Sequence, residues 1–164
     1  MQNFTQKYTI IQLFEDISEG TQFSSDNWPL HSTLVDTFAI GWNVPTMIRN
    51  LEKLLTNMSA ATSIVEGDTF FGPNQTIQVA LLRKSDSLLK LHNDIVTILQ
   101  KGDLKLNDPQ FAGTGFVPHS TVQNHARLHE GDQVIFDALT IIDMFPDDNP
   151  YLRKVLKTIR ISQP

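Results

Sequence analysis

The chain has 164 residues, 40% of them hydrophobic and 19% charged, a length and composition that fit one globular domain or two small lobes sharing a core. It contains no cysteine, which excludes disulfides, thiolate catalysis, zinc fingers and iron–sulfur clusters. The formal net charge of −5 argues against a protein that grips long duplex nucleic acid, because such proteins usually carry a basic face.

The first half of the chain predicts strands and one helix. Residues 8–14 (YTIIQLF) are β-branched and aromatic and predict a strand, whereas the polar stretch 15–27 predicts a loop. Further strands are predicted over 31–40, 62–65, 69–71 and 76–82, with breaks at 66–68 and 72–74. Apolar residues at helical spacing predict a helix over 45–58, with Asn43 as its cap and Pro45 in its first turn.

The second half repeats this order in outline. A helix is predicted over 86–101, with Ser85 as its cap and Gly102 just past its end, and a loop follows over 103–115. Strands are predicted over 120–124, 134–145 and 153–161, with a turn at 146–150. Helices and strands in mixed order, with several hairpin-length connections, predict an α+β fold with largely antiparallel pairing.

The tripeptide His-Ser-Thr occurs twice, at 31–33 and at 119–121, and its surroundings repeat as well. Each copy follows an aromatic residue and a proline and precedes an aliphatic residue: Trp28, Pro29 and Leu34 at the first copy, Phe116, Pro118 and Val122 at the second. Because side chains alternate along a strand, each histidine shares a face with its threonine, and the serine points to the packing behind. The offset of about half the chain suggests two pseudo-equivalent lobes.

If the two strands lie side by side, two imidazoles and two hydroxyls surround one small cleft. An imidazole gives or takes a proton near neutral pH, and a threonine hydroxyl can donate to a phosphoryl oxygen as charge develops there. Two histidines on opposite sides of a phosphorus can act in sequence without a metal. A single His-x-Thr is most simply a strand-edge histidine, but two copies with matched flanks make coincidence the weaker interpretation.

With these motifs the chain resembles the 2H phosphoesterase superfamily, which includes 2′-5′ RNA ligase-like proteins and cyclic phosphodiesterases. Phe116-Val-Pro-His-Ser-Thr-Val122 carries the resemblance best, since a proline directly before the histidine is typical of the family. The first motif departs slightly, with Leu30 before His31 and the proline one position earlier.

The resemblance covers nearly the whole chain. It implies a single bilobal, pseudo-symmetric domain over 1–164, with two mostly antiparallel sheets, outer helices and a central cleft. It also implies metal-independent cleavage of 2′,3′-cyclic or 2′-5′-linked phosphates. By motif position, His31 and His119 would be the acid–base pair, and Thr33 and Thr121 the phosphate ligands. Which histidine is the acid stays open.

Other residues are candidates of lower specificity. Trp28, Phe116 and Tyr8 could line the substrate site, although core packing explains the two flanking aromatics equally well. His125 and His129 have a spacing that could hold a metal on a helix, but the turn-like residues after them favour solvated loop histidines, and no metal site is expected. His92, on the apolar stripe of the second helix, is interpreted as a satisfied boundary residue.

The expected function is therefore a hydrolase of RNA-processing type, acting without a cofactor on a small nucleotide or an RNA 3′ end. Residues 1–7 lack a basic segment leading into an apolar run, and no apolar stretch is long enough to span a bilayer, so we expect a cytoplasmic monomer with no membrane contact. The alternative is a nucleotide- or RNA-binding module that keeps the cleft without turnover. The physiological substrate, and ligation against hydrolysis, stay open.

Overall fold

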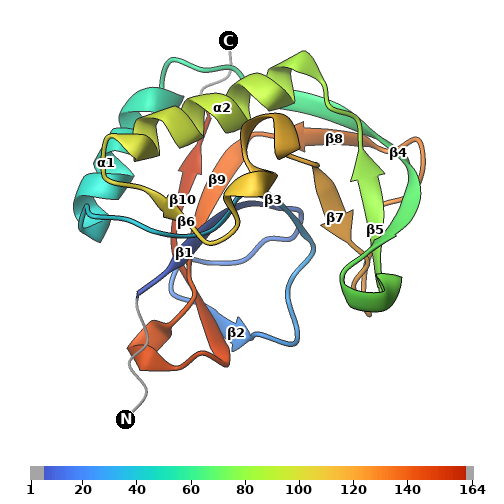
Figure 1. The fold of residues 1–164 in the computed structure, drawn as a ribbon, viewed down its shortest axis with the longest axis horizontal. Coiled ribbons are helices and arrows are strands. Elements are labelled where there is room, and N and C mark those ends of the chain that lie inside the picture. The colour runs from blue at the N-terminus through green and yellow to red at the C-terminus, as the bar shows by residue number, and fades with distance from the viewer. Residues whose placement is uncertain (1–5, 162–164) are drawn as a thin grey trace.

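Two antiparallel sheets and two helices make up residues 6–161, the part of the chain that the computed structural model describes (Figure 1). The six-stranded sheet has the order β2 (Gln22–Ser24), β10 (Leu152–Arg160), β9 (Ala138–Asp143), β1 (Tyr8–Leu13), β3 (His31–Ala39) and β6 (Lys105–Leu106). The four-stranded sheet has the order β7 (His119–Thr121), β5 (Ile77–Leu82), β4 (Ala61–Phe71) and β8 (Gln133–Phe136). The α+β class and the antiparallel pairing predicted from the sequence are confirmed.

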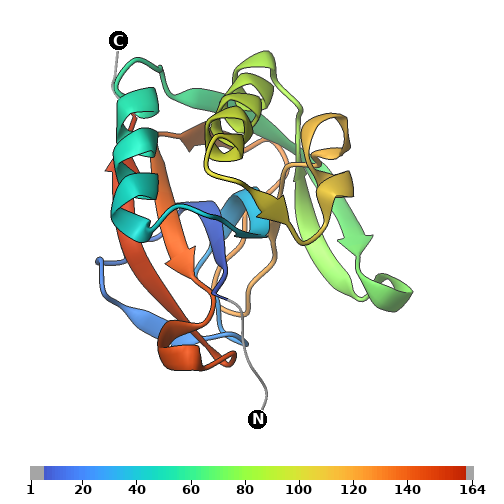
Figure 2. The same cartoon turned by 60° about the vertical axis from the view of Figure 1, so that its left-hand side comes forward.

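Both predicted helices form and carry the predicted caps. In α1 (Val44–Leu55) the Asn43 side chain accepts a hydrogen bond from the Thr46 N–H at 2.9 Å, and in α2 (Asp86–Gln100) Ser85 accepts from the Leu88 N–H at 3.3 Å. Each such cap stabilises a helix by about 1 kcal/mol. The helices lie together at one end of the molecule, where α1 contacts β10 and α2 contacts β3 and β4 (Figures 1 and 2).

One core joins the two sheets. Buried side chains from both sheets and both helices belong to a single cluster, which includes Ile10, Phe38, Leu51, Leu91 and Phe136. These five side chains are 0% exposed. The motif strands lie at the boundary between the two sheets. Because both sheets share this core, continuous packing stabilises that boundary.

Four predicted elements were wrong in ways that concern strand pairing. The loop predicted over 103–115 contains β6, which pairs with the end of β3. The stretch 15–27, predicted as a loop, contains β2, which pairs with β10. The break predicted at 66–68 is a β-bulge within the continuous strand β4, where Glu66 is the extra residue between Val65 and Gly67. The strand predicted over 134–145 is divided at Asp137, so that β8 joins the four-stranded sheet and β9 the six-stranded one.

Smaller differences concern where elements end and what the loops contain. The first helix ends at Leu55 and the strand after the second motif ends at Thr121, both three residues earlier than predicted. The loops hold short 3₁₀ turns: η1 (Pro73–Gln75), η2 (Pro109–Phe111), η3 (Gly113–Gly115) and η4 (Pro146–Asp148). The break predicted at 72–74 and the turn predicted at 146–150 coincide with η1 and η4, with η1 extending one residue further.

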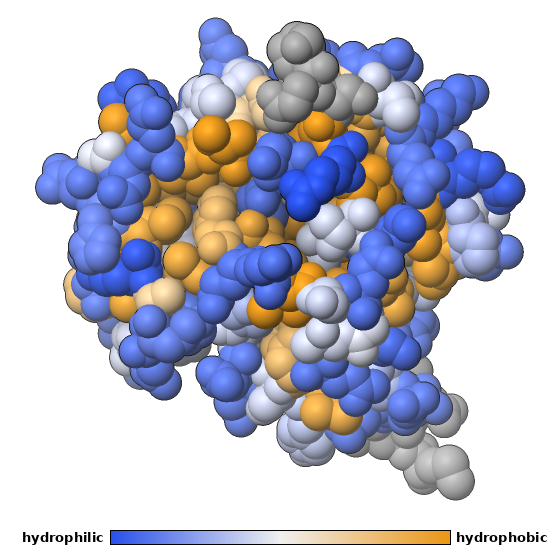
Figure 3. All heavy atoms as spheres, turned by 180° about the vertical axis from the view of Figure 1, so that it is seen from behind, coloured by the Kyte–Doolittle hydropathy of each residue, from blue (hydrophilic) through white to orange (hydrophobic). Residues whose placement is uncertain are grey.

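The described surface is mixed in polarity. Seen from behind, apolar residues gather in patches bordered by hydrophilic ones (Figure 3). Within residues 6–161 no helix is long and apolar enough to cross a membrane. The interpretation of the N-terminus rests mainly on residues 1–5, which lie outside the described part of the chain.

Candidate active site

The motif strands β3 and β7 lie side by side at the boundary of the two sheets, which meets the condition for a shared site. The Ser32 hydroxyl donates a hydrogen bond to the carbonyl of His119 (2.7 Å), and the Ser120 hydroxyl donates to the carbonyl of His31 (2.8 Å). Both serines are 1% exposed. The middle residue of each motif thus binds the backbone of the other motif's histidine, and this reciprocal pair joins the two half-sites directly.

The two imidazoles are held in the same way. His31 Nδ1 lies 2.8 Å from the carbonyl oxygen of Pro29, and His119 Nδ1 lies 2.8 Å from that of Val117, in each case two residues earlier. A carbonyl oxygen only accepts hydrogen bonds, so Nδ1 carries the hydrogen in both rings. This leaves Nε2 of each neutral ring with a free lone pair, the form that a proton acceptor requires.

An aromatic side chain packs against each histidine ring. The Trp28 ring centroid lies 4.9 Å from that of His31, and the Phe71 ring meets His119 edge-on at 4.8 Å. Trp28 also contacts Phe23 edge-on, with a centroid distance of 5.1 Å, and its ring centroid lies 5.8 Å from the guanidinium carbon of Arg153. The rings are therefore oriented by packing as well as by hydrogen bonds.

Burial lowers the pKa of both motif histidines. For His31 the carbonyl of Pro29 opposes this shift and the neighbouring His119 adds to it. For His119 the carbonyl of Val117 and the carboxylate of Asp36 oppose the shift. Since desolvation disfavours the imidazolium, both rings hold a proton less readily than a free histidine. Groups with perturbed pKa values in a cleft are candidates for acid–base chemistry.

A pocket of about 510 Å³ opens beside the motifs, lined by Thr33 and His119 together with Asp36, Phe116 and other apolar residues. Its volume falls within the range of about 300–1,000 Å³ that is typical of small-molecule sites. Phe116, one of the predicted lining residues, therefore lies on the wall of this pocket. Thr121 pairs with Val79 of β5 at the edge of the four-stranded sheet.

The other two predicted lining residues lie elsewhere. Trp28 lines a second, shallower pocket of about 320 Å³, between the loop after β1 and the loop after β7, and borders the site through its contact with His31. Tyr8 is 8% exposed, packs on Phe38 in the core and lines neither pocket. Its aromatic character reflects core packing in β1, so the expectation that it lines the substrate site is corrected.

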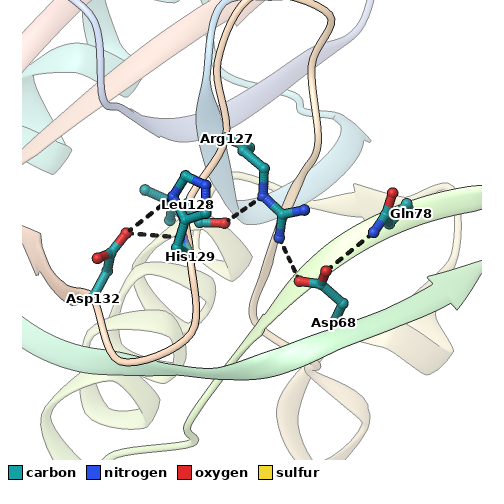
Figure 4. A network of polar contacts seen from close by, with 6 residues as sticks. All are labelled: Asp68, Gln78, Arg127, Leu128, His129 and Asp132. Carbon is teal, nitrogen blue, oxygen red and sulfur yellow. Dashed lines mark hydrogen bonds and ion pairs between the residues drawn. The ribbon is translucent and has the colours of Figure 1, made fainter.

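The loop that follows the second motif is tied to the four-stranded sheet by a polar network (Figure 4). The Arg127 guanidinium donates to the carboxylate of Asp68 (2.5 Å) and to the carbonyl of Leu128 (2.9 Å), and Gln78 donates to the same carboxylate (3.0 Å). Arg127 lowers the pKa of the Asp68 carboxyl. In the same loop the backbone N–H of His129 donates to the Asp132 carboxylate at 2.8 Å.

His125 and His129 lie in this loop and not on a helix, as the sequence indicates. The His125 ring pairs with the Glu15 carboxylate at 2.8 Å, and Glu15 also accepts from the backbone N–H of Leu30, directly before the first motif. These two bonds lower the pKa of Glu15, with the Leu30 bond the larger cause. Within residues 6–161 no group of three or more His, Cys, Asp or Glu side chains could hold a metal ion.

Three features near the site escape the sequence analysis. The serines were predicted to be buried, but not to bond across the two motifs. Asp36 lines the larger pocket although simple strand alternation places it on the opposite face from Thr33. His92 is 2% exposed and fully hydrogen-bonded, so it is an interior residue and not the boundary residue predicted. Its place on the apolar stripe of the second helix was the sequence feature that could have indicated a buried histidine.

The comparisons with known proteins show the family of the chain. The model of the 2′-5′ RNA ligase superfamily matches residues 10–146, and the chain belongs to this family of 2H phosphoesterases. Among curated proteins none matches the chain.

Solved structures share the fold. TT0787 of Thermus thermophilus is 13% identical, with a TM-score of 0.59, over 96% of this chain and 98% of that one. Escherichia coli LigT in complex with 3′-AMP is 15% identical, with a TM-score of 0.55, over 96% of this chain and 99% of that one. A structure described as a phosphoesterase is 14% identical, with a TM-score of 0.55, over 96% of this chain and 99% of that one.

Proposed function

We propose that the protein is a metal-independent phosphodiesterase that acts on 2′,3′-cyclic or 2′-5′-linked phosphates of small nucleotides or RNA 3′ ends. The observation that carries the proposal is the matched arrangement of His31 and His119, each with Nδ1 bound to a carbonyl and Nε2 free. Family membership supports the reaction class. LigT has been crystallised with 3′-AMP and with NADP+, which supports a nucleotide as the ligand.

In the proposed hydrolysis one histidine acts through Nε2 as the base and the other, protonated, as the acid. The base takes a proton from water as the water oxygen bonds to phosphorus. The acid gives its proton to the ribose oxygen as the bond between phosphorus and that oxygen breaks. The hydroxyls of Thr33 and Thr121 donate to the non-bridging phosphoryl oxygens, where negative charge increases in the transition state. The base histidine gains one proton and the acid histidine loses one, so the pair keeps its net charge over the step.

The test is turnover of a panel of 2′,3′-cyclic nucleotides and 2′-5′-linked dinucleotides by the wild-type chain and by His31→Ala and His119→Ala. General acid–base groups typically contribute about 10²- to 10⁴-fold, so each variant is expected to lose at least about 10²-fold in kcat. His129→Ala is the matched control, since that side chain is 70% exposed. Activity should also survive treatment with a chelator.

Two outcomes would overturn the proposal. Full activity in both motif variants would remove the histidines from the reaction. Tight binding of the panel without turnover by the wild-type chain would favour the alternative, a binding module that keeps the cleft.

A further inference from the structure

The larger pocket has a composition that suits a nucleobase rather than further phosphates. Phe71, Phe111 and Phe116 contribute aromatic surface to it. Among the described residues that line it, Asp36 is the only carboxylate and none is a lysine or an arginine. Aromatic faces stack on bases, whereas a carboxylate repels a phosphate, so the pocket favours the base end of a nucleotide.

A β-bulge directs Asp36 into this pocket. In the pairing of β1 with β3, Ile11 is opposite Thr33 but Ile10 is opposite Val35, so Leu34 is an extra residue; a second register shift follows between Val35 and Phe38. In a regular strand, residues three apart face opposite sides. The extra residue of the bulge changes the phase of the strand, so Asp36 projects on the same side as Thr33. Both residues line the pocket as a result.

His92 stabilises the bulge and the opposite wall of the pocket together. Its Nδ1 donates to the Leu34 carbonyl at the bulge (2.7 Å), and its Nε2 accepts from the Gly113 N–H (3.0 Å). Its ring stacks on Phe116 with a centroid distance of 3.9 Å and an interplanar angle of 2°. The carboxylate of Asp36 is oriented in turn by accepting from the Thr37 N–H at 2.8 Å. The His92 contacts thus link the strand backbone two residues before Asp36 to the aromatic wall.

The chemistry of a carboxylate selects among the four bases. A carboxylate only accepts hydrogen bonds, and guanine alone presents two adjacent N–H donors, N1–H and the N2 amino group, on one edge. Adenine and cytosine place a ring acceptor beside their amino group, and uracil places carbonyl oxygens on both sides of its N–H. A bidentate contact with two donors is thus available to guanine and not to the other bases.

We propose that this pocket is a base subsite selective for guanine, and that Asp36 is the residue that reads the base. The proposal rests on the proposed function, because it takes the phosphate of the same ligand to lie at the threonines of the two motifs. It narrows the substrate class to nucleotides or RNA ends whose base beside the reacting phosphate is guanine.

The experiment compares kcat/KM for the four 2′,3′-cyclic nucleotides in the wild type, in Asp36→Asn and in Asp147→Asn. A good bidentate contact discriminates between bases by about 5- to 150-fold, so the wild type should prefer the guanine nucleotide over the adenine one by this factor. Asp36→Asn should reduce or reverse the preference, because an amide offers adenine one donor and one acceptor. Asp147, exposed in the turn at 146–148, is the control and should leave the ratio unchanged.

The ratio of kcat/KM for the guanine nucleotide to that for the adenine nucleotide, measured at one pH, distinguishes recognition of the base from a general effect on the rate. Asp36 also raises the pKa of His119, but a change in that pKa alters the rates on all four substrates alike. Equal rates on the four bases, or a guanine preference that Asp36→Asn leaves intact, would overturn the subsite while the proposed function stands. Titration of 3′-GMP and 3′-AMP gives the second readout: preferential binding of 3′-GMP without turnover of any nucleotide supports the subsite and overturns the proposed function.

Discussion

The reciprocal serine bonds should control the rate through the separation of the two histidines. Ser32→Ala removes the donor to the His119 carbonyl, and Ser120→Ala removes the donor to the His31 carbonyl. A buried hydrogen bond contributes about 1 kcal/mol, and a carbonyl left without its partner costs about 1–3 kcal/mol, so each variant should lower the free energy of unfolding by about 1–3 kcal/mol. The larger effect is expected on catalysis, since a misplacement of about 1 Å can cost on the order of 10²-fold in rate.

The assay is urea unfolding together with steady-state kinetics on the best cyclic nucleotide. We expect kcat to fall by about 10-fold or more in each variant with little change in KM, because the bonds set the geometry of the reacting groups rather than contacts with the ligand. In the double variant the two effects should not add, since both bonds span the same boundary. Ser59→Ala, at an exposed position, is the control. An unchanged kcat in both single variants would mean that the serine bonds do not control the separation of the two histidines.

Two further predictions concern stability. A Cβ at Gly115 would lie 1.8 Å from the Gln110 carbonyl oxygen, so Gly115→Ala should lower the free energy of unfolding by about 1–3 kcal/mol in urea unfolding; unchanged stability would contradict this contact. Burial lowers the pKa of His31, His119 and His92 in the folded chain. As the pH falls, the unfolded chain therefore binds more protons than the folded one. The free energy of unfolding should therefore decrease as the pH drops below about 6.5 and change little above it, and a rise towards pH 5 would contradict the shifts.

The pairing of residues within each motif was predictable from the sequence, because it depends on a local pattern, whereas the chemistry proposed for the motifs stays a prediction. Alternation along a strand places His31 with Thr33, and the repeat of the motif places a second pair with them. The bulge at Leu34 is not visible in the sequence, since it depends on which residues of β1 lie opposite β3. Asp36 was missed for this reason, and so was the role of His92 in binding the bulge.

In the fold, too, local features were predictable and long-range strand pairing was not. The caps at Asn43 and Ser85 and the turn glycines act within a few residues, and the predicted helices and turns formed near them. The β2 strand has too few apolar residues to be recognised and forms because β10 offers it a partner edge. Residues 134–145 were predicted as one strand, yet the chain changes sheets at Asp137, because pairing with β4 and then with β1 and β10 depends on the tertiary structure.

The most direct test of the two-histidine site is the pH dependence of kcat/KM in the wild type and in His31→Ala and His119→Ala. The wild type should give a bell-shaped profile with its optimum below about pH 6.5, because the pKa of each histidine is lowered. The residual activity of each variant should keep one limb of the bell, a different one in each, which also identifies the acid and the base. A profile that keeps both limbs in either variant would mean that the replaced histidine is not one of the two titrating groups.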